Sequence, residues 1–145
     1  MRAVVQRVAR ARVTVEGIPL GEVDGGFCIL LGVARDDDEV KAQALAGKIS
    51  RLCIFPDDEG RFARSLLDVG GEALVVSQFT LLAETTKGTR PSFSKAAPSE
   101  QAESLYERFC KALREQGVNV ATGRFGALMQ VELVNDGPVT IVIDI

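Results

Sequence analysis

The stretch RFGALMQVELVNDGPVTIVIDI, residues 124–145, holds two apolar, strand-like runs on either side of a turn signal. The runs are 124–135 and 139–145, and Asp136, Gly137 and Pro138 lie between them. Aspartate and glycine favour turns, whereas proline removes a backbone donor where the second strand would begin to pair. We therefore expect a β-hairpin. The proline is either a rigid part of its turn, or a sign that these backbone atoms have a function of their own.

Apolar runs elsewhere predict the partners of this hairpin. Alternation over 3–8 and 11–17 is typical of two strands, and the continuous runs 25–34 and 72–79 are typical of buried strands. Shorter pieces of strand are expected in 52–60, interrupted by a turn, and near 118–120, whereas 65–71 is expected to be a loop.

Two segments have helical periodicity. A helix near 37–51 would begin at the acidic run Asp36–Asp38, because carboxylates cap helix N-termini and favour the positive end of the helix dipole. A second helix would begin at the cap Ser99 and end at Gly117. The expected class is α+β: a single compact domain over 1–145 with mostly antiparallel mixed sheets or a partial barrel, and two main helices on one side.

Composition excludes several classes of chemistry. The 145 residues are 46% hydrophobic and 26% charged, which is typical of globular proteins. Because there is no histidine, neither a Ser-His-Asp nor a Cys-His arrangement can form. The three separated cysteines make a poor zinc site and are interpreted as buried small hydrophobes in a reducing compartment. We expect no metal and no cofactor, and proton transfers that use carboxylate, lysine, tyrosine, water or the substrate itself.

The balance of charge limits the possible partners. A net charge of −3 and a pI of about 5.1 argue against broad, non-specific binding of nucleic acid. Basic residues do collect locally, as in 84–95, where Lys87, Arg90 and Lys95 are opposed by Glu84 alone, so a small anion site is compatible with an acidic chain. No apolar run approaches the roughly 20 residues of a membrane helix, and the first residues alternate like a strand. We expect no membrane partner and a cytoplasmic location.

Polar residues at the end of one buried strand form the first candidate site. Ser77, Gln78, Phe79 and Thr80 begin the stretch SQFTLLAE, where a strand passes into a long loop. Such residues could present hydroxyl, amide and backbone N–H groups to one point as an oxyanion cradle, or Thr80 could be a nucleophile. The alternative is a strand end whose polar residues only cap exposed backbone groups.

The loop over 81–98 is longer than most connections, and such loops are often functional. Its Lys87, Arg90 and Phe93 suit a phosphate and a stacked base, although an ordinary solvated loop has the same composition. Arg7 is a separate case, because it sits inside an alternating strand. It is either a plain exposed arginine or a buried one that holds backbone carbonyls.

Taken in order, these pieces resemble the D-aminoacyl-tRNA deacylase family. The matching pieces are MRAVVQRV at the start, LLGV (30–33), SQFTL (77–81), GTRPSF (88–93) and TGRFGALMQVELVNDGPVT (122–140). They span nearly the whole chain, and SQFTL and NDGPVT are the most specific. The resemblance implies the small α+β fold of this family, a homodimer, and hydrolysis of the ester between a D-amino acid and the terminal ribose of tRNA.

The resemblance also implies roles for individual residues. Backbone N–H groups of Gln78, Phe79 and Thr80 would stabilise charge, with Ser77 beside them. The 2′-hydroxyl of the terminal adenosine would activate water, and the Thr80 side chain would have a positioning role. Gly137 and Pro138, joined by a cis bond in the family, would enter the partner subunit's site and exclude L side chains, with Arg7 holding them in place. The residues expected to receive the CCA end are Lys87, Arg90, Phe93 and Met129. A filter that excludes side chains cannot exclude glycine, so cleavage of glycyl-tRNA, such as glycine mischarged on the tRNA for alanine, is expected.

Three other interpretations stay open. The first is a Thr80-dependent acyl hydrolase of a small ester or amide. The second is a non-enzymatic dimer that binds an RNA tip or a small ligand. In the third, the fold is the same but the Gly137–Pro138 bond is trans, which would relax the check on chirality, and the sequence cannot decide the isomer because the two differ by only about 0.5–1 kcal/mol.

Overall fold

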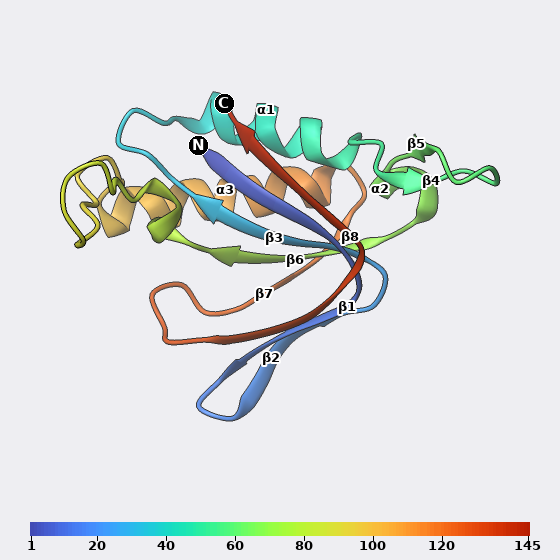
Figure 1. Cartoon of the computed structure of the whole chain (residues 1–145), viewed down its shortest axis with the longest axis horizontal. Helices are drawn as coiled ribbons and strands as arrows, with labels where there is room; N and C mark the ends of the chain where they lie inside the picture. The colour runs from blue at the N-terminus through green and yellow to red at the C-terminus, as the bar shows by residue number, and fades with distance from the viewer.

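The stretch 124–145 does not form the expected hairpin. In the computed structural model, which describes all 145 residues, β8 (Gln130–Asp144) runs as one strand beside β1 (Arg2–Val15) (Figure 1). The two strands pair antiparallel along nearly their whole length. The prediction of a hairpin is wrong because both apolar runs share one partner strand, and the same partnership joins the two predicted N-terminal strands into β1.

The residues expected to turn the chain form a bulge in β8 instead. Pairing with β1 passes from Asn135 to Thr140, so residues 136–139 face Arg7 alone. A bulge leaves its extra residues outside the ladder. Pro138 is therefore tolerated in the middle of a long strand, because no ladder hydrogen bond is required of it there.

Local contacts hold this bulge in shape. The Gly137–Pro138 peptide bond is cis, and residue 137 has a φ of 155°. A Cβ at Gly137 would lie 2.6 Å from the backbone nitrogen of Val139, so only glycine fits. The Val139 N–H donates to Asn135 Oδ1 at 2.9 Å, and Asn135 Nδ2 donates to Thr140 Oγ1 at 3.1 Å. Asn135 thus closes the bulge from one side to the other.

The main sheet is mixed and bends round until it nearly closes (Figure 1). Its other strands are β2 (Ile18–Val23), β3 (Gly26–Gly32), β6 (Glu72–Ser77) and β7 (Asn119–Thr122), in the order β2-β1-β3-β6-β7, with β8 also paired to β1. The pairs β3–β6 and β6–β7 are parallel and the rest are antiparallel. At the closing edge β2 approaches β7 so closely that a Cβ on Gly21 would lie 2.5 Å from the Thr122 carbonyl oxygen. The predicted α+β class with a mixed, partly closed sheet is confirmed.

Two long helices lie side by side across one face of the sheet, as predicted (Figure 1). They are α1 (Glu39–Ser50) and α3 (Ser99–Glu115). Asp38 caps α1 by accepting from the Lys41 N–H at 2.8 Å, whereas Ser99 is not a cap, because α3 begins at Ser99 after Pro98. None of the helices combines the length and the apolar character that spanning a lipid bilayer requires.

The remaining elements are short. The stretch predicted as an interrupted strand forms β4 (Phe55–Pro56) and β5 (Phe62–Arg64), which pair as a projecting hairpin (Figure 1). The stretch predicted as a loop contains the one-turn helix α2 (Leu66–Val69), which a reciprocal capping box of Ser65 and Asp68 stabilises. The 3₁₀ turn η1 (Phe79–Leu82) follows β6 directly.

The core is divided between the two faces of the sheet. The larger part lies between the sheet and the helices and is built on fully buried Phe27, Ile29, Leu45 and Phe109. A smaller part fills the inside of the bent sheet, where Val13, Cys28 and Leu74 are fully buried. The end of β6 belongs to both regions, because Val75 faces the helices and Val76 faces the bend. The residues that follow Val76 therefore emerge where the two regions meet.

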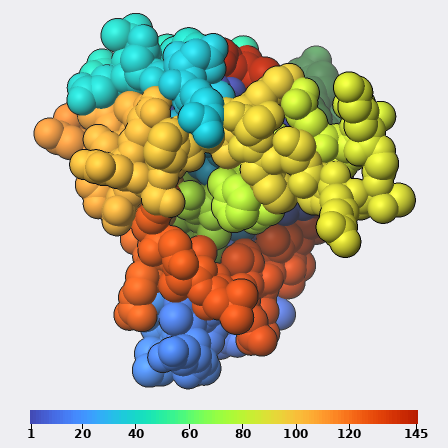
Figure 2. All heavy atoms as spheres, turned by 90° about the vertical axis from the view of Figure 1, so that its left-hand side faces the viewer, coloured from blue at the N-terminus to red at the C-terminus, as the bar shows by residue number.

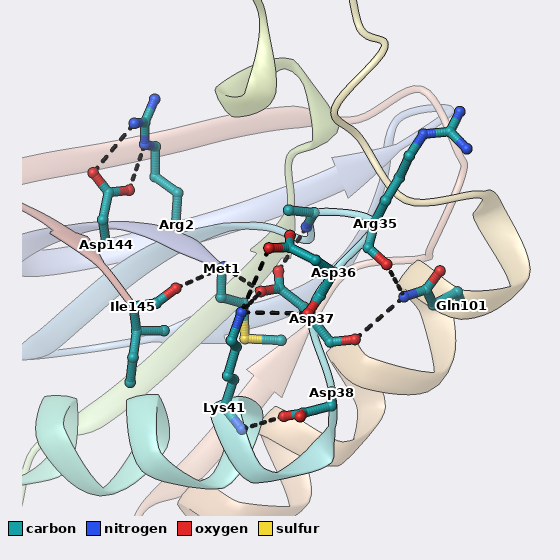
Figure 3. Close-up of polar contacts among 11 residues, drawn as sticks. Met1, Arg2, Arg35, Asp36, Asp37, Asp38, Lys41, Gln101, Asp144 and Ile145 are labelled. Atoms are coloured by element: carbon teal, nitrogen blue, oxygen red, sulfur yellow. Dashed lines mark hydrogen bonds and ion pairs between the residues drawn. The ribbon is translucent and has the colours of Figure 1, made fainter.

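A buried ion pair ties the first residue to the start of α1 (Figure 3). The Met1 ammonium lies 2.6 Å from Asp37 Oδ1, and both side chains are fully buried. The other carboxylate oxygen of Asp37 accepts from the Ala34 N–H at 2.7 Å, and Lys41 Nζ lies 3.3 Å from Asp37 Oδ1. Asp37 is therefore a tertiary contact and not the helix cap that its place in the acidic run suggests.

Candidate functional site

A cavity of about 580 Å³ opens at the end of β6. Figure 2 shows it from its open side, where the end of β6 (green) lies recessed between α3 (orange) and the segment 124–131 (orange-red). Its walls include Ser77, Gln78 and Phe79 after β6, Ser99 and Ala102 on α3, and Phe125 to Met129. A larger hollow of about 740 Å³ lies elsewhere, between β1, β2 and β8, but its charged residues include the ion-paired Arg12 and Glu132. The cavity at β6 is the better candidate because predicted site residues line it.

No residue that lines this cavity is ionisable. Its fourteen lining residues are seven aliphatic residues, two phenylalanines, one methionine, one glycine, two serines and one glutamine. The protein thus supplies no general acid or base at the cavity wall. Chemistry here depends on backbone dipoles, on neutral side chains and on groups that a ligand brings.

The backbone N–H groups of Phe79 and Thr80 lie at the start of η1, before the first donor of the turn itself. The first intrahelical donor of η1 is the Leu81 N–H, which reaches the Gln78 carbonyl at 3.2 Å, so the two preceding N–H groups have no partner in the turn. The Gln78 N–H is not available, because it donates to the Leu31 carbonyl at 2.8 Å. The expectation that the Gln78 N–H faces a reacting group is therefore wrong. The sheet ladder extends one residue beyond β6 and engages it.

The side chain of Gln78 contacts that of Thr80 instead. Gln78 Nε2 donates to Thr80 Oγ1, and Thr80 is exposed. An amide donor does not remove a proton from a hydroxyl group, and no carboxylate or amine is hydrogen-bonded to Thr80. The geometry therefore gives Thr80 no activating base.

The long loop is joined to the site through an aromatic pair. Phe93 meets Phe79 edge to face, with ring centroids 5.0 Å apart and an interplanar angle of 65°. Lys95 forms an ion pair with Glu84 at 2.6 Å. Lys87 and Arg90 are exposed in the loop, form no ion pair and do not line the cavity. The structure thus brings Phe93 to the edge of the site but leaves the two cations further out.

The opposite wall contains residues that sequence reasoning did not assign. Met129, which is expected to receive the CCA end, lines the cavity. Phe125, to which the sequence assigned no role, and Ser99, which was expected to be a helix cap, line it as well. Phe125 packs against Tyr106, whose hydroxyl donates to the Val75 carbonyl at 2.8 Å, and burial raises the pKa of Tyr106. Phe125 lies four residues before Met129 in the stretch 122–140 that resembles the family. This closeness in sequence is the signal that could have identified Phe125 as a site residue.

The second predicted group lies apart from this cavity. Gly137 and Pro138 are exposed and do not line it. Arg7 is largely buried and donates from Nε to the Asp136 carbonyl at 2.8 Å and from Nη1 to the Ile54 carbonyl at 2.7 Å. Of the two interpretations of Arg7, the buried arginine that holds backbone carbonyls is therefore the correct one.

Comparison with known proteins identifies the family to which this chain is similar. Residues 4–144 match the family described as D-Tyr-tRNA(Tyr) deacylase. The chain is 60% identical to a D-aminoacyl-tRNA deacylase of Roseiflexus castenholzii over 99% of this chain and 92% of the relative. A solved structure of a c-Myc DNA unwinding element binding protein is 42% identical, with a TM-score of 0.93 over 99% of this chain and 98% of that one. A probable eukaryotic D-amino acid tRNA deacylase shares the fold alone, at 18% identity and a TM-score of 0.88 over 99% and 98% of the two chains.

Proposed function

Because this chain belongs to the D-Tyr-tRNA(Tyr) deacylase family, we propose that it hydrolyses the ester of D-aminoacyl-tRNA to free D-amino acid and tRNA, in the cytoplasm. The observation that carries the proposal is the pair of N–H groups of Phe79 and Thr80, which have no partner within η1, beside a cavity without ionisable residues. An ester oxygen that becomes negative during hydrolysis needs such donors. An ester is already activated, so a site without a strong base is sufficient.

The proposed reaction takes its proton relay from the substrate. Water adds to the ester carbon while the carbonyl oxygen accepts from the N–H groups of Phe79 and Thr80. The 2′-hydroxyl of the terminal ribose receives a proton from the water and passes one to the departing 3′-oxygen, so the tRNA leaves with free hydroxyl groups. The absence of an ionisable group in the cavity wall supports this route, since no side chain there competes for the role.

The donor role of Phe79 can be tested by removing its N–H. Proline suits the first position of a helical turn, and the preceding Gln78, with a φ of −144° and a ψ of 80°, is not in the helical region that a following proline disfavours. We expect Phe79→Pro to hydrolyse D-Tyr-tRNA about 10²–10³-fold more slowly than Phe79→Ala, which removes the same ring but keeps the N–H. Equal rates in the two variants would contradict the proposal.

Thr80→Ala separates this mechanism from a covalent one. We expect it to retain most of its activity, because the hydroxyl accepts from Gln78 and has no base. Near-total loss, together with an acyl-enzyme that can be trapped, would favour a Thr80-dependent hydrolase. Release of neither D-tyrosine nor L-tyrosine from tRNA by the wild-type protein would leave only a binding module.

We assign rejection of L-aminoacyl-tRNA to Gly137 and Pro138 of the partner subunit in a homodimer. Two observations support this assignment: the pair is exposed and lies outside its own cavity, and Arg7 holds the adjacent Asp136 carbonyl. Backbone atoms entering a second subunit's cavity would exclude an L side chain and leave room for a D side chain. Pro138→Ala is expected to hydrolyse L-Tyr-tRNA while remaining folded, and unchanged rejection of L-Tyr-tRNA would reduce the motif to a bulge.

A dimer also accounts for an apolar row on the sheet. Val142 is 60% exposed and lies opposite Val4, which in turn lies opposite Leu30, on the face turned away from the helices. Apolar residues grouped on one face indicate a partner. Sedimentation equilibrium should give a dimer for the wild-type protein and a monomer for Val142→Glu.

A site that rejects substrates by excluding their L side chains cannot reject glycine, because glycine has no side chain. We therefore propose that glycyl-tRNA, including glycine mischarged on the tRNA for alanine, is also a substrate. Release of glycine at the enzyme concentration that cleaves D-Tyr-tRNA is the expected result. Complete resistance of glycyl-tRNA would contradict exclusion of the side chain as the basis of selectivity.

The tip of the tRNA is proposed to bind between the long loop and α3. Phe79 and Phe93 offer aromatic faces to a base, Lys87 and Arg90 offer cations to the phosphates, and Met129 forms the apolar wall. The N-terminus of α3 faces the same cavity through Ser99, and its dipole favours an anion there. Recognition limited to the CCA end is compatible with a pI of about 5.1.

A further inference from the structure

The turn η1 rests directly on β3 at a single glycine. An added Cβ at Gly32 would lie 3.1 Å from the Gln78 carbonyl oxygen and would collide with Leu82 Cδ2. A distance of 3.1 Å is tighter than nine in ten real Cβ contacts, so the carbonyl would have to move. Gly32 therefore sets how closely η1 approaches the sheet.

That carbonyl belongs to the same peptide unit as the Phe79 N–H. A peptide unit is planar, so its carbonyl oxygen and its N–H turn together. A rotation of this unit that moves the Gln78 oxygen away from Gly32 therefore also turns the N–H of Phe79. The contact at Gly32 acts on a donor of the proposed site without touching a substrate.

Arg2 contacts the same turn through a hydrogen bond. Arg2 Nη1 donates to the Leu81 carbonyl at 3.1 Å, and the Leu81 N–H donates to the Gln78 carbonyl at 3.2 Å. Asp144 orients Arg2 by accepting from Nε at 2.6 Å and from Nη2 at 3.2 Å (Figure 3). The guanidinium group thus donates two hydrogen bonds to the Asp144 carboxylate and one to η1, and its planar shape fixes their directions.

We propose that Gly32 and Arg2 are positioning residues that together set the orientation of the Gln78–Phe79 peptide, with Asp144 orienting Arg2. The proposal rests on the proposed role of the Phe79 N–H in hydrolysis. An ion pair between exposed side chains contributes little to stability. The proposal therefore gives the pair of Arg2 and Asp144 a role in positioning η1. The side chains of Arg2 and Asp144 are 42% and 61% exposed.

The chain contains a matched control for Arg2. Arg12 and Glu132 form a second pair between β1 and β8, with side-chain exposures of 44% and 65%, and Arg12 makes no contact with η1. Single-turnover hydrolysis of D-Tyr-tRNA is expected to be about tenfold slower in Arg2→Ala with an unchanged KM, because small displacements of catalytic groups are costly. Arg12→Ala should keep the wild-type rate. Equal rates in the two variants would overturn the proposal.

Arg2→Lys separates position from charge. Lysine keeps the positive charge but has no planar fork to bridge Asp144 and Leu81. We expect Arg2→Lys to be as slow as Arg2→Ala, again at unchanged KM. Full recovery by lysine, or a change confined to KM, would mean that Arg2 only attracts tRNA.

Gly32→Ala tests the other contact, with Gly25→Ala as its control. A Cβ at Gly25 has no atom within 4 Å. Gly32→Ala should lower the rate of hydrolysis by about tenfold or more at unchanged KM, whereas Gly25→Ala should not change it. Wild-type hydrolysis by folded Gly32→Ala would overturn the role of Gly32.

Hydrogen exchange provides a readout that does not depend on activity. The N–H groups of Leu81 and Ala83 close η1 by donating to Gln78 and Thr80. Their exchange should be faster in Arg2→Ala than in Arg12→Ala, whatever the substrate. If this result holds while the wild-type protein hydrolyses no D-aminoacyl-tRNA, the proposed function fails and the positioning contact stands. Unchanged exchange in an active enzyme would mean that Arg2 does not hold the turn.

Discussion

Asp36, Asp37 and Asp38 are neighbours in the sequence but lie in three different environments. Asp38 caps α1, Asp36 extends into solvent, and Asp37 is buried against the Met1 ammonium. The acidic run predicted the start of a helix, because capping is a local property. It could not predict which carboxylate would be buried, because the partner of Asp37 lies 36 residues away and is reached only after the sheet has formed.

Replacing Asp37 should be far more damaging than replacing its neighbour. Asp37→Ala leaves a buried ammonium without its partner, which costs roughly 3–5 kcal/mol of the free energy of unfolding. Urea denaturation followed by circular dichroism would measure the loss. Asp36→Ala is the control, since the Asp36 side chain is 86% exposed, and it should change the free energy of unfolding by less than about 0.5 kcal/mol. Similar losses in the two variants would contradict the buried ion pair.

At the scale of the element, local sequence patterns correctly located the strand residues of β8 but wrongly predicted that they form a hairpin. The apolar runs, Gly137 and Pro138 identified a strand region with a break, and the break is real. Whether a break becomes a turn or a bulge depends on the partner, and β1 pairs with both sides of it. For the same reason the predicted helices α1 and α3, which carry their own periodicity, were found, whereas the largely exposed β2 was missed.

Asn135→Ala should loosen this bulge. It removes the acceptor of the Val139 N–H and the donor to Thr140, while leaving the pairing of β8 on either side intact. We expect the free energy of unfolding to fall by about 1–2 kcal/mol. We also expect faster hydrolysis of L-Tyr-tRNA relative to D-Tyr-tRNA, because the bulge carries Gly137 and Pro138. Asn119→Ala, at the exposed first residue of β7, is the control for an asparagine lost from a strand. Wild-type selectivity in Asn135→Ala would show that the side chain does not support the motif.

The charges of the whole molecule predict how its affinity for tRNA responds to salt. Lys87 and Arg90 are the unpaired cations of the long loop, and the net charge is −3. For a single strand, the log–log slope of affinity against salt is about −0.7 per phosphate neutralised. Contact with about two phosphates therefore gives a slope of roughly −1.5. Titrations from low to physiological salt would measure it, and a slope steeper than about −4 would indicate an extended interface with tRNA.

The stability of the whole molecule should fall at both ends of the pH scale. Hydrogen bonds from Arg61, Ser65 and Arg2 lower the pKa of Asp57, Asp68 and Asp144, so their contribution is present above about pH 4 and is lost as pH falls through the lower folded values. Burial raises the pKa of the Cys28 and Cys110 thiols to about 11, so their contribution is lost as pH rises from about 9 through 11. Without histidine, the melting temperature should be nearly constant between about pH 5 and 7. A marked change of the melting temperature between about pH 5 and 7 would contradict the assignment of the pH dependence to these aspartates and cysteines.

The pairing of β1 with β8 has a consequence for how the chain reaches its fold. It joins residues 2–14 to residues 130–144, so the longest ladder of the sheet requires the closure of a loop that spans most of the chain. Loop closure of that kind is entropically costly and slows folding. Until it occurs, one edge of β1 is an open template for strands of other chains. Slow refolding in dilute solution and aggregation in concentrated solution are the expected outcome of a sheet whose longest ladder forms late.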